Sequence, residues 1–137
     1  MKEYITNSPE ETFDLGNNLG QSCQGGEVIL LLGDLGAGKT CFTQGLAKGL
    51  GVKGKVNSPT FNLMKVYKTT IGVLCHIDAY RLNSGNDLIA IGLDDYLARK
   101  DAVVVIEWAE KVKDIWPKNK IKINFKNYKE GRKIKIF

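Results

Sequence analysis

GDLGAGKT, from Gly33 to Thr40, is the most informative segment of the sequence. With Lys39 directly before Thr40, it satisfies the pattern Gly-x-x-x-x-Gly-Lys-Ser/Thr, which is typical of a phosphate-binding loop. Glycines let backbone N–H groups turn toward an anion, and a following helix adds partial positive charge at its N-terminus. In such a loop the lysine reaches the β- and γ-phosphates and the hydroxyl binds Mg²⁺. The stretch therefore predicts a nucleotide site, against the alternative of a glycine-rich turn with a solvated lysine.

The sequence on either side of this loop predicts a strand before it and a helix after it. The run EVILLLG, residues 27–33, is apolar almost throughout and ends in glycine, as expected for a strand buried on both faces. Phe42, Leu46 and Leu50 then recur at the spacing of one helix face, and Gly51 follows as a helix stop. Strand, loop and helix in this order are the context that a phosphate-binding loop requires.

The remaining segments add helices and strands. Ser8, Pro9 and Glu11 form a capping-box pattern at the start of a first helix. Residues 55–70 and 72–82 predict a loop leading into two adjacent strands, and residues 87–97 predict a helical stretch. DAVVVIEW, residues 101–108, predicts a second buried strand, and lysines alternating with apolar residues at 120–126 and 132–137 predict a hairpin.

This order of elements favours an α/β fold. Buried strands that alternate with helices predict a three-layer P-loop NTPase with a mostly parallel central sheet and antiparallel additions. The length of 137 residues suits a single P-loop ATPase domain over residues 1–137.

Two acids are candidates for the catalytic carboxylate. Glu107 ends a fully apolar run, so its side chain is expected at the sheet edge where nucleotide-binding strands end. Asp78 ends the less apolar segment LCHID. We favour Glu107 as the Mg²⁺ ligand, directly or through water, and Asp78 as a supporting group or as the residue that positions the nucleophile. The alternative for either acid is a loop cap.

Missing motifs favour ATP over GTP and hydrolysis over phosphoryl transfer. No Asp is followed three residues later by Gly, and no Asn-Lys-x-Asp occurs, so the signatures of GTP-switch proteins are missing. A small-molecule kinase fits poorly, because the chain has only three arginines, Arg81, Arg99 and Arg132, and little length for an arginine-bearing lid or acceptor pocket. We therefore expect an ATPase that uses ATP and Mg²⁺.

Charge is unevenly distributed along the chain. The segment from Lys111 to Phe137 contains ten Lys or Arg residues and only two acids, Asp114 and Glu130, so its net charge is +8. This segment fits contact with RNA or an acidic protein surface, but lysines that guard edge strands against aggregation are the favoured alternative.

The cysteines are odd in number and lack metal-ligand spacing, which favours free thiols. No signal-peptide pattern and no membrane-spanning apolar run occurs, so a cytoplasmic protein without membrane contact is expected.

Four motifs together resemble one known family. GDLGAGKT, NSPTFNLMKVY, HIDAYRL and IEWAEK, in this order, look like the TsaE (YjeE) family. The likeness runs from Ser8 to the segment GRKIKI, which is nearly the whole chain. It implies a P-loop ATPase required for threonylcarbamoyladenosine in tRNA, weak alone and stimulated by the partner proteins TsaB and TsaD. tRNA would be reached indirectly, through that complex.

The resemblance also implies roles for individual residues. It places Mg²⁺ ligands at Thr40 and Glu107, a switch-like catalytic threonine at Thr60 and the family's acid at Asp78. A Pro-stiffened turn is the alternative for Thr60. The family's phosphate loop falls on Leu35, Gly36, Ala37, Gly38, Lys39 and Thr40.

The resemblance also singles out three further residues. Ser8 and Arg132 are candidates for contacting the adenine by their place in the family pattern, with a helix cap and a solvated strand charge as alternatives. Trp108 follows the metal-binding glutamate, where a tryptophan is more often core packing or an interface anchor than a catalyst. A small P-loop kinase and a nucleotide-dependent RNA-binding module remain the competing functions.

Overall fold

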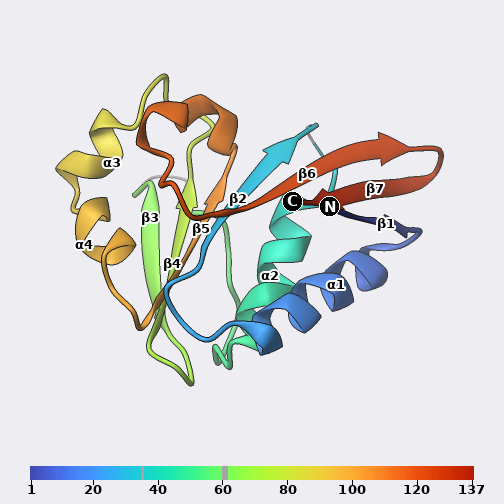
Figure 1. Ribbon diagram of the computed structural model, residues 1–137. Coiled ribbons are helices and arrows are strands. Elements are labelled where there is room, and N and C mark those ends of the chain that lie inside the picture. The colour runs from blue at the N-terminus through green and yellow to red at the C-terminus, as the bar shows by residue number, and fades with distance from the viewer. Residues whose placement is uncertain (35, 60–61) are drawn as a thin grey trace.

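A computed structural model describes residues 1–34, 36–59 and 62–137, and its centre is one seven-stranded sheet with the strand order β1-β7-β6-β2-β5-β4-β3 (Figure 1). The four central strands run parallel, and the three others pair antiparallel at the two sides. The parallel strands are β2 (Val28–Gly33), β4 (Val73–Asp78), β5 (Ala102–Glu107) and β6 (Ile121–Tyr128). The antiparallel strands are β1 (Lys2–Thr6), β3 (Met64–Lys68) and β7 (Gly131–Ile136).

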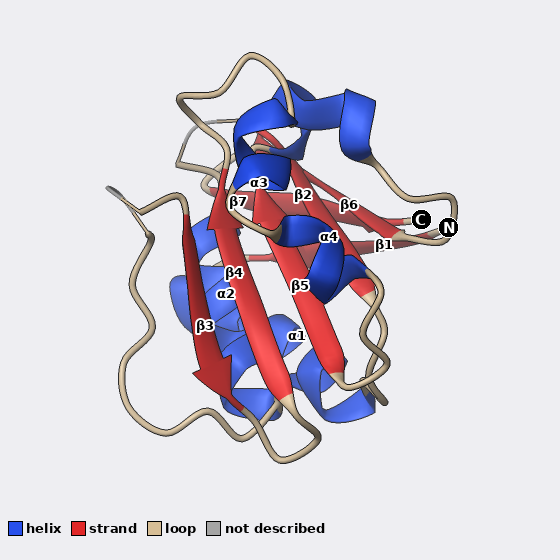
Figure 2. Ribbon diagram, turned by 90° about the vertical axis from the view of Figure 1, so that its left-hand side faces the viewer, coloured by secondary structure: helices blue, strands red, loops and turns tan. Residues whose placement is uncertain are grey.

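Helices cover the sheet from both faces, which gives the three layers expected of this fold class. Figure 2 shows two long helices behind the sheet, and short helices in front of it. The long helices are α1 (Pro9–Ser22) and α2 (Lys39–Gly49). The short helices are α3 (Asn86–Ala90), α4 (Leu93–Leu97) and the 3₁₀ helix η1 (Ala109–Ile115). The predicted α/β architecture with a mostly parallel centre and antiparallel additions is confirmed.

Strand β2 is buried on both faces, which explains its uninterrupted apolar run. Ile29 and Leu31 point into the core under α1 and α2, whereas Val28 and Leu30 belong to the core on the opposite face. Phe42 and Leu46 of α2 complete the first of these cores. The alternation follows from the strand period of two, so one short run supplies side chains to both layers.

The first helix begins as its capping residues predict, with one difference. The Glu11 N–H donates to Ser8 Oγ at 3.2 Å. Glu11 Oε1 in turn accepts from the Asn7 N–H at 2.9 Å, one residue before the cap, instead of from Ser8. The first bond satisfies an N–H group that the first turn of the helix leaves without a partner, and the second ties the residue before the cap to the helix.

Helices α1 and α2 lie parallel and touch through glycines. A Cβ atom on Gly16 would lie 2.2 Å from the Phe42 carbonyl oxygen, and one on Gly45 would lie 2.0 Å from that of Phe13. Gly20 and Gly49 repeat the arrangement one turn later. We call these four residues the glycine seam. Because no side chain separates the helices there, the two backbones are in direct contact.

Two local features differ from the sequence-based expectations. The helical stretch at residues 87–97 is two short helices, because Gly92 adopts a left-handed φ of 97° that ends the first. The C-terminal hairpin forms as predicted, but its lysines are not on an edge strand, since β1 pairs with β7 and covers that edge. The aggregation-guard interpretation of these lysines is therefore wrong.

Among the described residues, none of the helices has the length and apolar character needed to cross a membrane.

Candidate nucleotide site

The loop between β2 and α2 has the backbone of an anion-binding turn. Gly36 and Gly38 have φ values of 71° and 100°, in the left-handed region that favours glycine. Lys39 and Thr40 open α2, and its first turn contains no acidic residue that would neutralise the helix dipole. The structure thus brings Gly36, Ala37, Gly38, Lys39 and Thr40 together, whereas Leu35 lies outside the described residues.

The Lys39 ammonium lies inside this loop. Its Nζ donates to the carbonyl oxygens of Gly33 at 2.7 Å and Asp34 at 2.6 Å, and the side chain belongs to a residue only 5% exposed. Burial lowers the pKa of Lys39, while nearby carboxylates, first among them Glu110, act in the opposite direction. The loop's own carbonyls therefore hold the cation at the position where a phosphate-binding lysine is needed.

Thr40, Glu107 and His76 form a hydrogen-bonded chain across three elements. Thr40 Oγ1 donates to Glu107 Oε1 at 2.9 Å, and Glu107 Oε2 lies 2.5 Å from His76 Nε2. Glu107 is only 2% exposed, so both carboxylate oxygens depend on these partners. The carboxylate is held from both sides, with one oxygen turned toward the first turn of α2.

Two oxygen ligands at this spacing suit Mg²⁺. Adjacent corners of an octahedron with Mg–O distances of about 2.1 Å lie about 3 Å apart. The 2.9 Å separation of Thr40 Oγ1 and Glu107 Oε1 matches that edge. Hydroxyl and carboxylate oxygens are also the hard donors that this ion prefers, with phosphates and waters completing its coordination. The pair therefore fits the predicted metal role.

Asp78 lies at the end of β4 beside Glu107 and also caps a turn. It pairs in register with Glu107 on the neighbouring parallel strand, so the two acids lie side by side at the sheet edge. Its Oδ1 accepts from the Tyr80 N–H at 3.0 Å, which is a loop-capping bond. Burial raises the pKa of the Asp78 carboxyl, and that backbone N–H acts in the opposite direction. One oxygen caps the turn while the residue stays beside Glu107.

Ser8 and Arg132 line the same cleft beside the phosphate loop. Arg132 Nη2 donates to the Gly36 carbonyl oxygen at 2.9 Å, so β7 is tied directly to the loop. The Ser8 hydroxyl already accepts from the Glu11 N–H, as a helix cap does. The cleft has a volume of about 260 Å³ and is lined by Asn7, Ser8, Pro9, Thr12, Gly36, Gly38, Cys41, Glu130, Gly131 and Arg132.

Thr60 lies outside the described residues. Ser58, two residues earlier, has its Oγ 3.3 Å from Thr40 Oγ1. Trp108 lies on the other side of the site. Its ring centre is 4.0 Å from Lys39 Nζ and 5.0 Å from the ring of Tyr80, which is 53% exposed.

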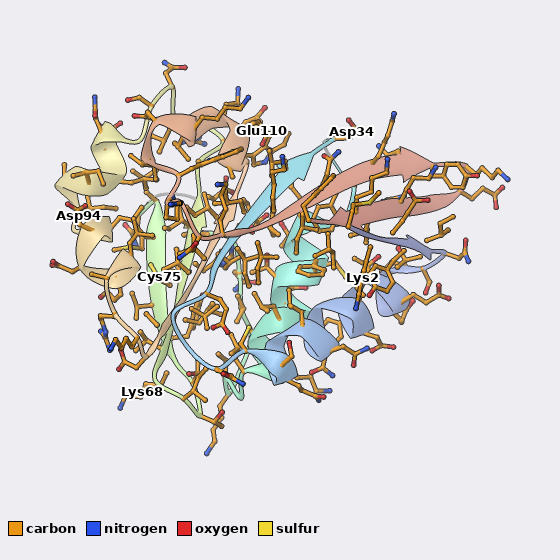
Figure 3. The ribbon with its side chains drawn as sticks, viewed as in Figure 1. Lys2, Asp34, Lys68, Cys75, Asp94 and Glu110 are labelled. Atoms are coloured by element: carbon orange, nitrogen blue, oxygen red, sulfur yellow. The ribbon has the colours of Figure 1, made fainter. Side chains whose placement is uncertain are left out.

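Sequence reasoning missed two residues of the site. His76 lies two positions before Asp78 on one strand, and this period-two spacing was the available signal for a shared face. Glu110 is the second residue of η1, and its Oε2 accepts from the Gly33 N–H at 3.1 Å. Figure 3 shows Glu110 and Asp34 near the same end of β2. Nothing in the sequence alone indicates that Glu110 folds back onto the loop.

Comparison with known proteins gives a consistent family. The sequence model described as "Threonylcarbamoyl adenosine biosynthesis protein TsaE" matches residues 6–134. The chain is 39% identical to the tRNA threonylcarbamoyladenosine biosynthesis protein TsaE of Bacillus subtilis, over 90% of this chain and 77% of the relative. It is 37% identical to the Treponema pallidum protein of the same name, over 94% of each. The Aquifex aeolicus protein of that name is 42% identical over 82% of this chain and 80% of the relative.

A solved structure has the same fold. The crystal structure of YdiB from Bacillus subtilis superposes with a TM-score of 0.79 at 32% sequence identity, covering 97% of this chain and 82% of that one.

Proposed function

The chain belongs to the family of threonylcarbamoyl adenosine biosynthesis protein TsaE, and from this premise we propose that it binds and hydrolyses Mg·ATP in the threonylcarbamoyladenosine modification of tRNA. One observation carries the ATPase part of the proposal. The phosphate-loop lysine and a threonine–glutamate oxygen pair meet at the N-terminus of α2, beside a cleft large enough to take part of a nucleoside. These are the groups that phosphate binding and metal binding require.

Each residue has a task in this mechanism. Lys39 exchanges its two carbonyl partners for phosphate oxygens and stabilises the charge that develops on them. Thr40 and Glu107 hold the metal, and His76 keeps the Glu107 carboxylate oriented. A bound Mg²⁺ supplies neutralising charge to the triphosphate. Asp78, beside Glu107, orients the attacking water through its uncapped oxygen.

The cleft between α1 and β7 is the proposed adenosine side of the site. The cleft lies next to Gly36 and Gly38 of the phosphate loop, and Arg132 borders both the cleft and the loop. A guanidinium plane can stack on a base, which gives Arg132 a contact of the required kind. The Ser8 hydroxyl is engaged in the helix cap, so Ser8 contributes to the adenosine side through its backbone and its place in the wall of the cleft.

TsaB and TsaD are the proposed partners. The support is an aromatic pair at the rim of the site, in which exposed Tyr80 packs on half-buried Trp108. Exposed aromatic side chains beside a functional site are typical interface anchors.

Thr60 is proposed as a switch residue, since Ser58 already contacts Thr40. Hydrogen exchange over residues 57–63 should differ between an ATP analogue and ADP, and identical exchange would contradict the switch.

Phosphate release from Mg·ATP tests the proposal as a whole. We expect slow release by the chain alone and clear stimulation by TsaB and TsaD from the same organism. Brisk release that ignores both partners, or a γ-phosphate transferred to an organic acceptor, would favour the kinase alternative instead.

A further inference from the structure

The outer face of the β6–β7 hairpin carries a basic groove. Its volume is about 350 Å³, and it is lined by Asn124, Lys126, Asn127, Tyr128, Lys133 and Lys135. We call it the hairpin groove. In Figures 1 and 3 the hairpin extends to the side of the molecule, with α1 and α2 below it, and polar side chains project from it.

The groove lies on the face that the long helices leave open. Ile123, Phe125 and Ile134 are buried in the core shared with α1 and α2. Asn124 and Lys126 alternate with these strand positions and therefore point away from that core. On their side of the sheet, α4 contacts β5 and η1 contacts β2, away from the far end of the hairpin (Figure 2). The groove is therefore solvated.

The groove concentrates positive charge at a cost in stability. Lys126 lies directly opposite Lys133, and like charges in such a cross-strand pair destabilise a sheet. The Lys135 ammonium is paired with the Glu3 carboxylate, with Nζ 3.8 Å from Oε2. For the Lys126–Lys133 pair, the described residues offer no carboxylate within 4.0 Å. Edge protection does not account for these lysines either, because β1 separates β7 from the edge. An anionic ligand would relieve the repulsion.

The aromatic and amide groups indicate which anion fits. The Tyr128 ring centre lies 4.3 Å from Lys133 Nζ and 5.3 Å from Lys129 Nζ. An aromatic ring flanked by ammonium groups is a typical platform for single-stranded nucleic acid, where a base stacks and phosphates pair with lysines. Asn124, on the same face of β6 as Lys126, adds an amide group that can hydrogen-bond a base edge. An acidic peptide would use the lysines but would leave the ring and this amide without a role.

We propose that the hairpin groove binds RNA directly, with phosphates at Lys126 and Lys133 and an unpaired base on Tyr128. This contact goes beyond the proposed ATPase function, in which tRNA is reached through partner proteins. The groove is also connected to the nucleotide site, because the Asn127 N–H donates to Asp34 Oδ2 of the phosphate loop at 3.3 Å. Arg132 and Lys133 are neighbours on β7 that face the cleft and the groove respectively.

The experiment measures binding of the full chain to unmodified tRNA by fluorescence anisotropy, without partners, between 50 and 200 mM KCl. We expect salt-dependent binding that K126Q/K133Q weakens about tenfold, with a salt slope smaller by roughly 2. The matched control is K53Q/K100Q, which removes two exposed lysines and the same charge elsewhere. Tyr128→Leu should weaken tRNA binding while leaving binding of polyglutamate unchanged.

Several outcomes would overturn the proposal. Equal losses in K126Q/K133Q and K53Q/K100Q would mean that net charge alone attracts tRNA. Loss of polyglutamate binding in K126Q/K133Q, with Tyr128→Leu binding tRNA normally, would assign the groove to an acidic protein. Phosphate release by K126Q/K133Q should equal that of the unmodified chain, so failure of RNA binding is distinguishable from failure of the ATPase proposal. Thermal melts check that each variant is folded.

Discussion

The Lys39 ammonium lies 4.0 Å from the ring centre of Trp108, the residue directly after Glu107. This contact joins the phosphate loop to the end of β5. Trp108 reaches it from a left-handed backbone with φ 57°, which is uncommon for a bulky residue. Strain of this kind persists where the surrounding structure holds it, and it is found mostly at functional sites. The ring thus links the lysine to the exposed Tyr80 on its other side.

Trp108→Ala should lower partner-stimulated phosphate release more than it lowers ATP affinity. We expect about a tenfold loss of stimulated turnover, corresponding to about 1.4 kcal/mol, with nucleotide affinity changed less than about threefold. Titration with a fluorescent ATP analogue gives the affinity. Trp108→Phe, which keeps an aromatic face over Lys39, should recover part of the turnover. A large loss of affinity in the alanine variant would contradict the interface role.

Lys39→Ala and Glu107→Ala should each reduce ATP turnover by at least about a hundredfold. The first removes the cation from the phosphate loop, and the second removes one of the two proposed metal ligands. Circular dichroism should show the fold retained in both variants. Lys48→Ala, on the last turn of the same helix, is the control and should turn over normally. Normal turnover in both site variants would rule out this site.

Arg132→Ala should weaken ATP binding about tenfold without abolishing turnover at saturating nucleotide, because its guanidinium borders the cleft and fixes Gly36. Lys133→Ala is a close control, since it removes a neighbouring charge from the opposite face of the same strand. Isothermal titration of both variants makes the comparison. Equal effects would show that Arg132 acts only through overall charge.

Gly45→Ala should destabilise the protein by about 2 kcal/mol, since an added methyl group overpacks a site with no free space. The new Cβ would lie 2.0 Å from the Phe13 carbonyl oxygen. This loss would occur although alanine favours a helix over glycine by about 1 kcal/mol. Asn18→Ala, at an exposed position on α1, should leave urea denaturation nearly unchanged. A stabilised Gly45→Ala variant would mean that the helices separate at little cost.

Stability should fall above pH 9 because of two buried thiols. Burial raises the pKa of Cys75 from 9.0 to about 12, and that of Cys23 to about 12 as well. Between these values the unfolded thiol loses its proton and the folded thiol keeps it, so each thiol lowers the free energy of unfolding by about 1.4 kcal/mol per pH unit. Below pH 9 both states are protonated and the effect is absent.

Cys75→Ala isolates this contribution. Urea denaturation under reducing conditions, at pH 8 and pH 10, should show a decline smaller by about 1.4 kcal/mol in the variant than in the unmodified chain. Any loss of packing from the substitution is the same at both pH values and cancels. Equal declines would place the Cys75 thiol in contact with solvent.

Elements set by local sequence were predictable, and those set by distant contacts were not. The strand, loop and helix around Lys39 follow from glycine chemistry and apolar spacing within a short segment, and the structure confirms them. Strand β1 was missed because most of its residues are exposed and it exists only by pairing with β7, at the other end of the chain. Its sequence contains no continuous apolar run to indicate it.

The site shows the same division. Thr40 and Glu107 were predicted as metal ligands because Thr40 closes the phosphate-loop motif and Glu107 ends a buried strand, and the structure places their oxygens 2.9 Å apart. His76 and Glu110 act through side-chain orientation across strands and through the turn after β5, which sequence patterns do not determine. The functional roles of all these residues stay predictions, and Leu35 and Thr60 also lie outside the described residues. The glycine seam had a visible signal, since its members are four residues apart on each helix, but that spacing alone does not identify the facing helix.

The glycine seam also divides the molecule mechanically. Sliding α1 along α2 would drive backbone atoms into one another, so the two helices move as one rigid body. That body includes both the Ser8 end of the cleft and the lysine of the phosphate loop. Any rearrangement on nucleotide binding is therefore expected outside this pair of helices, for example in the segment that carries Ser58, whose hydroxyl contacts Thr40.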